Sequence, residues 1–293
     1  MTETRLLLIS DVHLGRNAFG VDGEKWSAPL WEAVAIAKSE GAECIVSAGD
    51  LFNSRNPSQD DFDQFTGAMA GNLFIDVEGN HTRGQRRDDL PAANVLREHA
   101  QAKERWAFVT GLAPFRPAGD LLLLPWPRPV DYLSDAEIAE RGIADQIALT
   151  RERVMLTLRA VCEAASGPLL LTGHAMMSYG AGEPPMLGKD VVLRYEDLRA
   201  LPNVAEVLMG HVHDPAQPGY IGSTQPTDWG EVGQVKSCVL VTFAGGKITT
   251  KRIPYQSSLK LWMIEARYEG KGWDYIAPPG RADVLRARVT VAE

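Results

Sequence analysis

Five apolar, strand-like runs of this 293-residue chain each lead into side chains that can bind a metal ion. The five junctions are Asp11-Val12-His13, Gly49-Asp50, Gly79-Asn80-His81, Gly173-His174 and Gly210-His211-Val212-His213. In the last one, the two-residue spacing sends both imidazoles to the same side of an extended backbone. In an α/β fold, functional groups gather on the loops at the carboxyl ends of strands. We therefore expect the five junctions to meet in one site.

The distribution of histidine supports a metal site. The chain has six histidines, and all but His99 lie at the junctions. His99 falls in a predicted helix and is interpreted as structural. A lone Asp-x-His, Gly-Asp or Gly-Asn sequence would indicate only a polar turn, because these residues are common turn formers. The joint pattern is what predicts metal binding.

Strands and helices alternate along the first part of the chain. Apolar runs predict strands at residues 5–10, 44–48, 73–77, 106–110, 121–124 and 169–172. Helices are predicted at residues 27–40, from about residue 57, at residues 89–100 and at residues 134–165, the last with a break near Gly142. Five prolines between Gly111 and Val130 predict irregular structure there. The alternation is typical of an α/β fold.

After His213 the pattern changes to β. Runs at residues 219–222, 237–243, 247–254 and 259–267 predict strands, with a hairpin turn at Gly245-Gly246. We expect these strands to complete a second sheet packed on the first. Residues 284–291 alternate in the manner of a further strand. The sequence suggests a main domain at residues 1–256 and a small appendage at residues 257–293.

The composition is that of a soluble globular protein, with 45% hydrophobic and 23% charged residues. No apolar run approaches the ~18 residues of a membrane span. The N-terminus begins with a strand and lacks the basic region and long apolar segment of a secretory signal. Cys44, Cys162 and Cys238 lack metal-type spacing and are interpreted as reduced, buried thiols. These features predict a cytoplasmic protein.

The formal net charge of −8 argues against a surface that coats nucleic acid, because phosphate binding depends on clustered Lys and Arg. Bound divalent cations would cancel part of this charge, and a local cluster matters more than the sum. Arg83, Arg86 and Arg87 form such a cluster directly after His81. We expect them to hold phosphates that flank the one being cut. Pairing with surface acids is the alternative interpretation.

The ligand types at the junctions suit a borderline or hard divalent ion. The seven candidates are Asp11, His13, Asp50, Asn80, His174, His211 and His213. They are too many for one ion with an open position, but they suit two ions that share a carboxylate. Two ions about 3.5–4 Å apart can activate a bridging water to hydroxide and hold the oxygens of a phosphoryl group during in-line displacement. Mn²⁺ is the first choice and Mg²⁺ the alternative.

The order of motifs DVH, GDLF, GNH, GH and GHVH resembles the calcineurin-like metallophosphoesterase superfamily. Residues 49–58, 78–83, 220–224 and 228–231 are further similar to SbcD-type nucleases, the nuclease subunits of double-strand-break repair complexes. The likeness covers roughly residues 5–254. It implies a four-layer α-β-β-α sandwich of two mixed sheets.

The resemblance also implies a role for each junction residue. Asp11, His13 and His213 would hold one ion, and the other would be held by Asn80, His174 and His211, with Asp50 as the bridge. His81 would lie near the scissile phosphate and stabilise charge there or protonate the leaving oxygen. One departure is that Thr82 stands where the family usually has an acidic residue. Thr82 cannot supply the carboxylate that would orient the His81 ring.

The activity implied by the resemblance is that of a manganese-dependent DNA exonuclease and endonuclease in an SbcCD-like complex. Its partners would be DNA and an SbcC-type SMC-like ATPase, and the chain would form a homodimer through helices of its first half. Residues 257–293 are short for the DNA-contacting cap of such nucleases. An ordinary packed β appendage explains the aromatic and basic residues there at least as well as direct DNA contact does; these are Trp262, Trp273, Arg286 and Arg288. The alternatives are a phosphodiesterase or phosphatase acting on small nucleotides and a non-catalytic scaffold, which the filled ligand positions disfavour.

Overall fold

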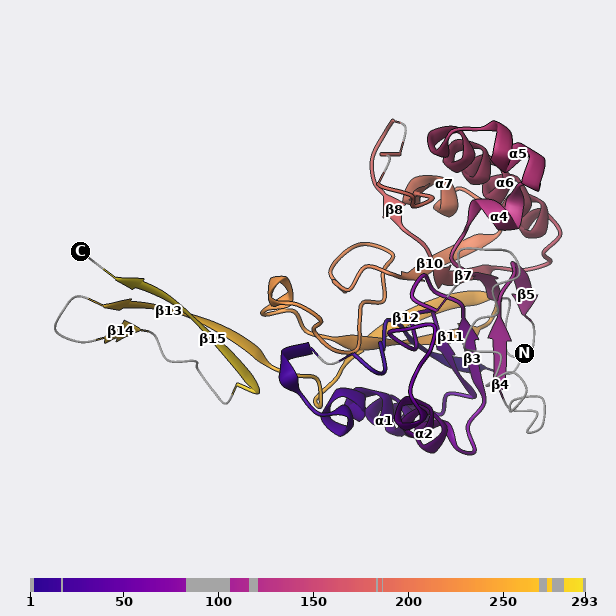
Figure 1. Cartoon of the computed structure of the whole chain (residues 1–293). Coiled ribbons are helices and arrows are strands. Elements are labelled where there is room, and N and C mark those ends of the chain that lie inside the picture. Colours follow the sequence, from indigo (N-terminus) through magenta and orange to yellow (C-terminus); the bar gives the residue numbers. More distant parts are fainter. Residues whose placement is uncertain are drawn as a thin grey trace.

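Two β-sheets lie face to face, and helices cover the outer face of each (Figure 1). The computed structural model describes residues 3–16, 18–82, 106–115, 121–182, 184–185, 187–268, 273–275 and 282–291. These residues form the layered sandwich of two mixed sheets that the sequence predicts. The predicted fold class is confirmed.

The first sheet has the strand order β12-β11-β1-β2-β3-β4. Its strands are β1 (Thr4–Ile9), β2 (Cys44–Ser47), β3 (Phe74–Val77), β4 (Trp106–Val109), β11 (Ser237–Ala244) and β12 (Lys247–Pro254). Strands β1 to β4 run parallel, and β11 pairs with β1 in the antiparallel direction. Parallel strands place their carboxyl ends at one edge, so the loops after β1, β2 and β3 are neighbours.

The second sheet has the order β10-β7-β6-β5. Its strands are β5 (Ala113–Phe115), β6 (Leu121–Leu124), β7 (Leu169–His174) and β10 (Val204–Gly210). Strands β6, β7 and β10 run parallel, with Gly210 opposite His174 in the register. The register thus ends both histidine-bearing strands at the same level.

Helices α1 (Gly23–Glu40) and α2 (Gln59–Met69) cover the first sheet, at the bottom of Figure 1. The second sheet is covered by α4 (Pro129–Tyr132), α5 (Asp135–Glu140), α6 (Ile143–Glu163) and α7 (Tyr195–Arg199). Helix α1 begins before the predicted start at residue 27, because Asp22 caps it by accepting a hydrogen bond from the Lys25 amide. The predicted break at Gly142 is confirmed, since it separates α5 from α6.

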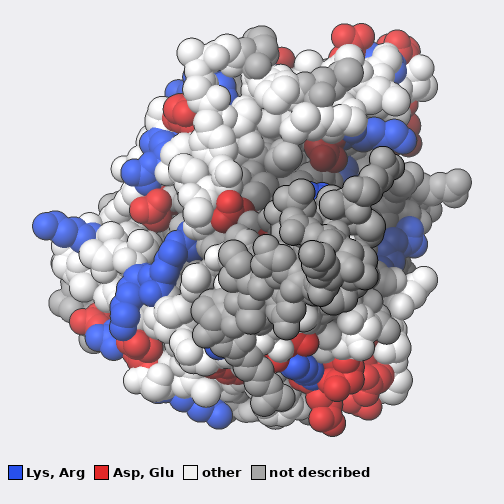
Figure 2. Space-filling model, turned by 90° about the vertical axis from the view of Figure 1, so that its left-hand side faces the viewer, with Lys and Arg blue, Asp and Glu red and all other residues white. Residues whose placement is uncertain are grey.

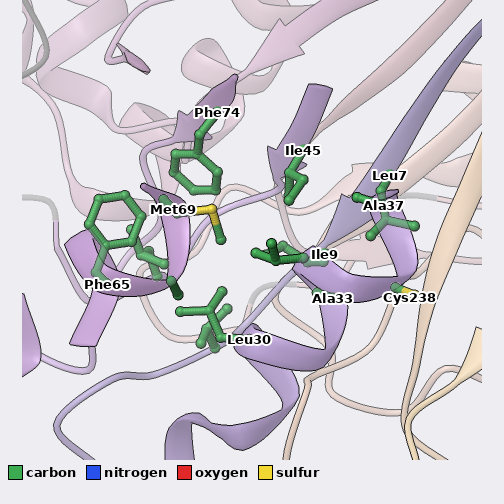
Figure 3. Packing of buried hydrophobic residues seen from close by; sticks show 14 of the residues in the cluster. Leu7, Ile9, Leu30, Ala33, Ala37, Ile45, Phe65, Met69, Phe74 and Cys238 are labelled. Atoms are coloured by element: carbon green, nitrogen blue, oxygen red, sulfur yellow. The ribbon is translucent and has the colours of Figure 1, made fainter. Parts of the chain in front are cut away.

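Strand β1 shows how the sequence forms these layers. Successive side chains of a strand point to opposite faces, so an apolar run is buried on both. Leu7 and Ile9 pack toward α1 and α2 (Figure 3), and Leu6 and Leu8 pack into the layer between the two sheets. All four are at most 1% exposed, and burial of each contributes about 1.5–3 kcal/mol. The core thus continues on both faces of the first sheet.

The structure corrects three sequence predictions. Strands β11 and β12 extend the first sheet instead of completing the second, although their hairpin at Gly245-Gly246 is as predicted. Residues 219–222 form only an isolated bridge between Tyr220 and Met209. The segment predicted to be irregular contains β5 and α4, because Pro129 occupies the first turn of α4, where no amide hydrogen is needed. The helix predicted at residues 89–100 lies outside the described residues.

The C-terminal strands form a separate sheet that extends away from the body (Figure 1). It consists of β13 (Leu261–Tyr268), β14 (Trp273–Tyr275) and β15 (Val284–Val291). Lys25 pairs with Asp283 at 2.7 Å, and the Gln225 carboxamide accepts a hydrogen bond from the Leu259 amide at 2.7 Å. These contacts fix the base of the sheet against the body. Within the described part of the chain, no helix has the length and apolarity needed to cross a membrane.

Candidate metal centre

The loops after β1 and β2 bring the first three candidate ligands together. The Asp11 amide donates to the Gly49 carbonyl at 3.0 Å, and the His13 amide donates to the Asp50 carbonyl at 2.9 Å. Asp11, His13 and Asp50 all have a positive φ, between 49° and 53°. Such a backbone costs non-glycine residues free energy and is found where the fold demands a particular side-chain direction. Here the direction is into the space between the two sheets' loops.

Asp11, His13 and His213 form the first candidate ligand group. The Nε2 atoms of His13 and His213 lie 3.2 Å apart, and Asp11 Oδ1 lies 3.9 Å and 3.8 Å from them. Two nitrogen atoms that bind the same ion, each at about 2.1 Å, are expected to lie about 3 Å apart. The spacing of these three groups therefore fits a shared cation.

Asn80, His174 and His211 form the second group. Asn80 Oδ1 lies 2.9 Å from His174 Nε2 and 3.1 Å from His211 Nδ1. The Trp126 ring packs against both imidazoles, with centroids 5.8 Å from His174 and 4.7 Å from His211. His174 Nδ1 lies 2.9 Å from the Ala48 carbonyl oxygen, which accepts its hydrogen and leaves Nε2 facing Asn80. This geometry also fits a cation.

Asp50 lies between the two groups. Its Oδ2 is 3.3 Å from His174 Nε2, while its Oδ1 accepts the His81 amide at 2.9 Å. Asp50 completes one candidate set with Asp11 and His174 and another with His13 and His81. A Cβ at Gly79 would lie 2.1 Å from Asp50 Oδ1, so only glycine leaves room for this carboxylate. The position suits a bridging ligand.

Burial prepares the imidazoles for metal binding. It lowers the pKa of His13 and of His211 to about 4, so both rings are neutral near pH 7 and keep a free lone pair. His174 behaves differently: burial would lower its pKa, but the Asp50 carboxylate raises it to about 9. Burial would raise the pKa of Asp50, but the His174 imidazole holds it well below its usual value. The buried site thus favours a positive charge beside Asp50, which a divalent cation can supply.

The calcineurin-like phosphoesterase family model matches residues 4–215 of the chain. The chain belongs to this family. Its members are metal-dependent phosphoester hydrolases, and the described His and Asp groups of this phosphoesterase are able to bind metal.

Two kinds of relative accompany the family match. The chain is 25% identical over 294 residues to the SbcD subunit of the nuclease SbcCD from Rhodobacter capsulatus, covering 90% of this chain and 72% of that protein. The structure of a dimetal phosphatase from Danio rerio aligns with a TM-score of 0.52 at 15% identity, over 86% of this chain and 99% of that one. The protein TT1561 of Thermus thermophilus aligns with a TM-score of 0.44 at 18% identity, over 86% and 99%. The Danio rerio likeness supports the fold.

A backbone carbonyl orients His81 in this phosphoesterase. His81 Nδ1 lies 3.1 Å from the Asn53 carbonyl oxygen, and its Nε2 lies 4.0 Å from Asp50 Oδ2. Thr82 is buried, and its hydroxyl donates to the Gly79 carbonyl. The Asn53 carbonyl, in the loop after β2, therefore orients the His81 ring in place of the carboxylate that Thr82 cannot supply. The His81 side chain is 37% exposed, so it can reach a molecule that enters from solvent.

Two further groups of this phosphoesterase bear on the sequence predictions. Arg83, Arg86 and Arg87 lie outside the described residues. The sequence assigned no role to Thr227, Glu231 and Lys236, which surround the outer nitrogen and backbone of His213. Glu231 lies within residues 228–231, but that stretch was noted only for its similarity to SbcD-type nucleases.

Proposed function

We propose that this phosphoesterase is a manganese-dependent DNA nuclease and the nuclease subunit of an SbcCD-like repair and recombination complex. Metal-dependent hydrolysis is supported by one observation, the two candidate ligand groups that meet at Asp50. The nuclease part is supported by the likeness to the SbcD subunit of Rhodobacter capsulatus, which extends over 90% of this chain.

In this proposal each ligand group binds one divalent ion. Asp11, His13 and His213 hold the first ion, and the second is held by Asn80, His174 and His211, with Asp50 shared. When bound, the two ions polarise phosphoryl oxygens and activate the attacking water. The mixture of imidazole, carboxylate and amide oxygen suits Mn²⁺, with Mg²⁺ as the alternative.

His81 acts on the substrate rather than on the ions. Its Nδ1 hydrogen is held by the Asn53 carbonyl, so Nε2 faces the site beside Asp50. From there the ring stabilises charge on the phosphate or transfers a proton to the leaving oxygen. The exposed edge of the ring allows a DNA strand to approach it.

The remaining assignments rest on the sequence and on the resemblance to SbcD-type nucleases. Arg83, Arg86 and Arg87 hold phosphates next to the scissile one, and residues 257–293 form a partial cap beyond the domain at residues 1–256. The chain works as a homodimer with an SbcC-type SMC-like ATPase, in the cytoplasm. An SbcC-type protein that fails to bind this chain in a pull-down experiment would contradict the partner assignment.

One observation favours a second function, hydrolysis of small nucleotides. The net charge is −8, and on the face shown in Figure 2 the Lys and Arg side chains lie among Asp and Glu side chains. A small nucleotide needs no extended basic surface, whereas DNA affinity depends on phosphate contacts.

A cleavage assay distinguishes the two functions. Single-stranded, blunt-ended and hairpin DNA would each be incubated with Mn²⁺, with Mg²⁺ or with chelator, beside a small phosphodiester. We expect Mn²⁺-dependent DNA cleavage that rising salt weakens. Alanine at Arg83, Arg86 and Arg87 should slow DNA cleavage and flatten its salt dependence while leaving the small ester unaffected. Hydrolysis of the small ester without DNA cleavage would favour the second function.

A further inference from the structure

A buried polar cluster lies behind His213, on the side away from the proposed ion. We call it the Glu231 cluster; its members are Thr227, Glu231, Gln234 and Lys236. His213 Nδ1 is 2.7 Å from Thr227 Oγ1 and 3.1 Å from Glu231 Oε1. Thr227 Oγ1 also donates to Glu231 Oε1 at 2.6 Å. One carboxylate oxygen therefore faces both the imidazole and the hydroxyl.

Lys236 holds the other carboxylate oxygen. Its Nζ donates to Glu231 Oε2 at 2.5 Å, to Gln234 Oε1 at 2.7 Å and to the His213 carbonyl at 2.9 Å. The Lys236 side chain is 2% exposed and that of Glu231 is 7% exposed. All three ammonium hydrogens thus have acceptors, and one of them fixes the backbone of His213 itself.

The stability of the fold alone does not explain such a cluster. A buried ion pair loses its hydration, and well-packed apolar residues of the same volume are often equally stable or more stable. Glu231 Oε1 faces His213 Nδ1 and Glu231 Oε2 accepts from the Lys236 ammonium, so a charged pair lies buried directly behind the imidazole. A function for this charge explains why it is kept beside a metal-ligand candidate.

Other imidazoles of the centre are supported differently. His174 Nδ1 is held by the Ala48 backbone carbonyl, and His13 Nδ1 has no partner within the described ranges. His213 is 22% exposed at its side chain, whereas His13 is 1% exposed. Packing fixes the His13 ring, but the more exposed His213 ring needs another restraint.

We propose that Glu231 is a positioning residue for His213, held in turn by Lys236. Glu231 accepts the Nδ1 hydrogen of His213, which selects the tautomer whose Nε2 lone pair faces Asp11 and His13. Lys236 fixes both the carboxylate and the His213 carbonyl, so ring and backbone are oriented together. The inference rests on the metal assignment of the proposed function, and it adds that the first ion depends on the Glu231 cluster while the second does not.

Two variants of the cluster test this proposal. Glu231→Gln keeps an acceptor oxygen for Nδ1 but removes the carboxylate charge that pairs with the buried Lys236 ammonium. The double variant Glu231→Leu with Lys236→Met removes the cluster without leaving one charge alone. Glu137→Gln is the matched control, because it breaks a 2.5 Å pair with Arg153 in the α5–α6 region.

The measurement is calorimetric titration of Mn²⁺ into the chelator-treated full chain, with the melting temperature in chelator as a check on folding. We expect one of two sites to weaken by about 10–100-fold in the double variant, with a smaller loss in Glu231→Gln. The second site and the Glu137→Gln protein should match wild type. Equal weakening of both sites, or unchanged binding in the double variant, would overturn the proposal. Should the double variant not fold, Glu231→Gln decides alone: selective weakening of one site supports the positioning role and unchanged binding contradicts it.

Normal two-site binding by wild type without DNA cleavage would instead refute the proposed nuclease function.

Discussion

The two halves of the candidate metal centre are held in place by different parts of the chain. Side chains of the Glu231 cluster support His213 in the first half. In the second half, the Ala48 backbone carbonyl holds His174, and the Trp126 ring packs on His174 and His211. Substitution of the Glu231 cluster can therefore weaken metal binding by the first half without disturbing the sheets. The second half is tied to the packing of β7 and β10 and to the fold itself.

Asp50→Ala should produce the largest effect, because Asp50 lies between the halves and is expected to serve both. We expect loss of both ions and a fall in phosphodiester hydrolysis of at least about 10³-fold, since metal ions supply several kcal/mol of transition-state stabilisation. Elemental analysis and a small-ester assay would measure the two effects. A variant that keeps one ion at wild-type affinity would show that the halves do not share this residue.

His81→Ala should affect chemistry without affecting either half. We expect both ions to remain, because the ring is held by the Asn53 carbonyl at the exposed edge of the centre. Phosphodiester cleavage should fall by about 10²–10⁴-fold, the range for loss of a positioned acid or base. Steady-state kinetics with parallel metal analysis checks this. Activity near wild type would remove His81 from the mechanism.

Gly210→Ala tests the backbone-supported half. A Cβ there would lie 2.0 Å from Ser10 Oγ, 2.3 Å from the Ala48 carbonyl oxygen and 2.9 Å from His174 Nδ1. We expect a loss of about 1–3 kcal/mol in the free energy of unfolding, measured by urea titration in chelator, because backbone must shift. Gly111→Ala is the control, because a Cβ there meets nothing within 4 Å and its φ lies outside the left-handed region. Equal losses in the two variants would contradict the steric cause at Gly210.

Thr227→Val should have the smallest effect and should act on the side-chain-supported half. It removes one hydroxyl that contacts both His213 Nδ1 and Glu231 Oε1. A single hydrogen bond contributes about 0.5–1.5 kcal/mol, so the affinity for the first ion should fall by at most about tenfold. Calorimetric titration of Mn²⁺ would measure the change. A loss larger than that of the Glu231 double variant would mean that Thr227, and not Glu231, orients the ring.

The sequence predicted the α/β fold class well because strand-length apolar runs and their alternation with helices are local features, whereas the four-layer arrangement was implied by the resemblance to the metallophosphoesterases. It predicted β11 and β12 as strands but assigned them to the wrong sheet, since alternation does not identify the pairing partner. The junction residues were found because parallel strands end at one edge, and the structure brings their side chains together. That they bind two ions stays a prediction.

The supports of the centre could not be predicted. The Asn53 carbonyl that holds His81 is a backbone atom with no sequence signature. Glu231 and Lys236 follow His213 by 18 and 23 residues, and only the folded loop shows that both are buried behind that histidine. Buried polar partners of this kind depend on tertiary contacts, which residue spacing does not encode.

Counting the ions bound by the wild-type chain tests the central claim most directly. The chelator-treated protein would be saturated with Mn²⁺, freed of excess metal and weighed by native mass spectrometry, with Asp50→Ala measured in parallel. We expect two ions per chain in wild type and none in Asp50→Ala. A single ion in saturated wild type, or two ions in Asp50→Ala, would contradict a shared two-metal centre.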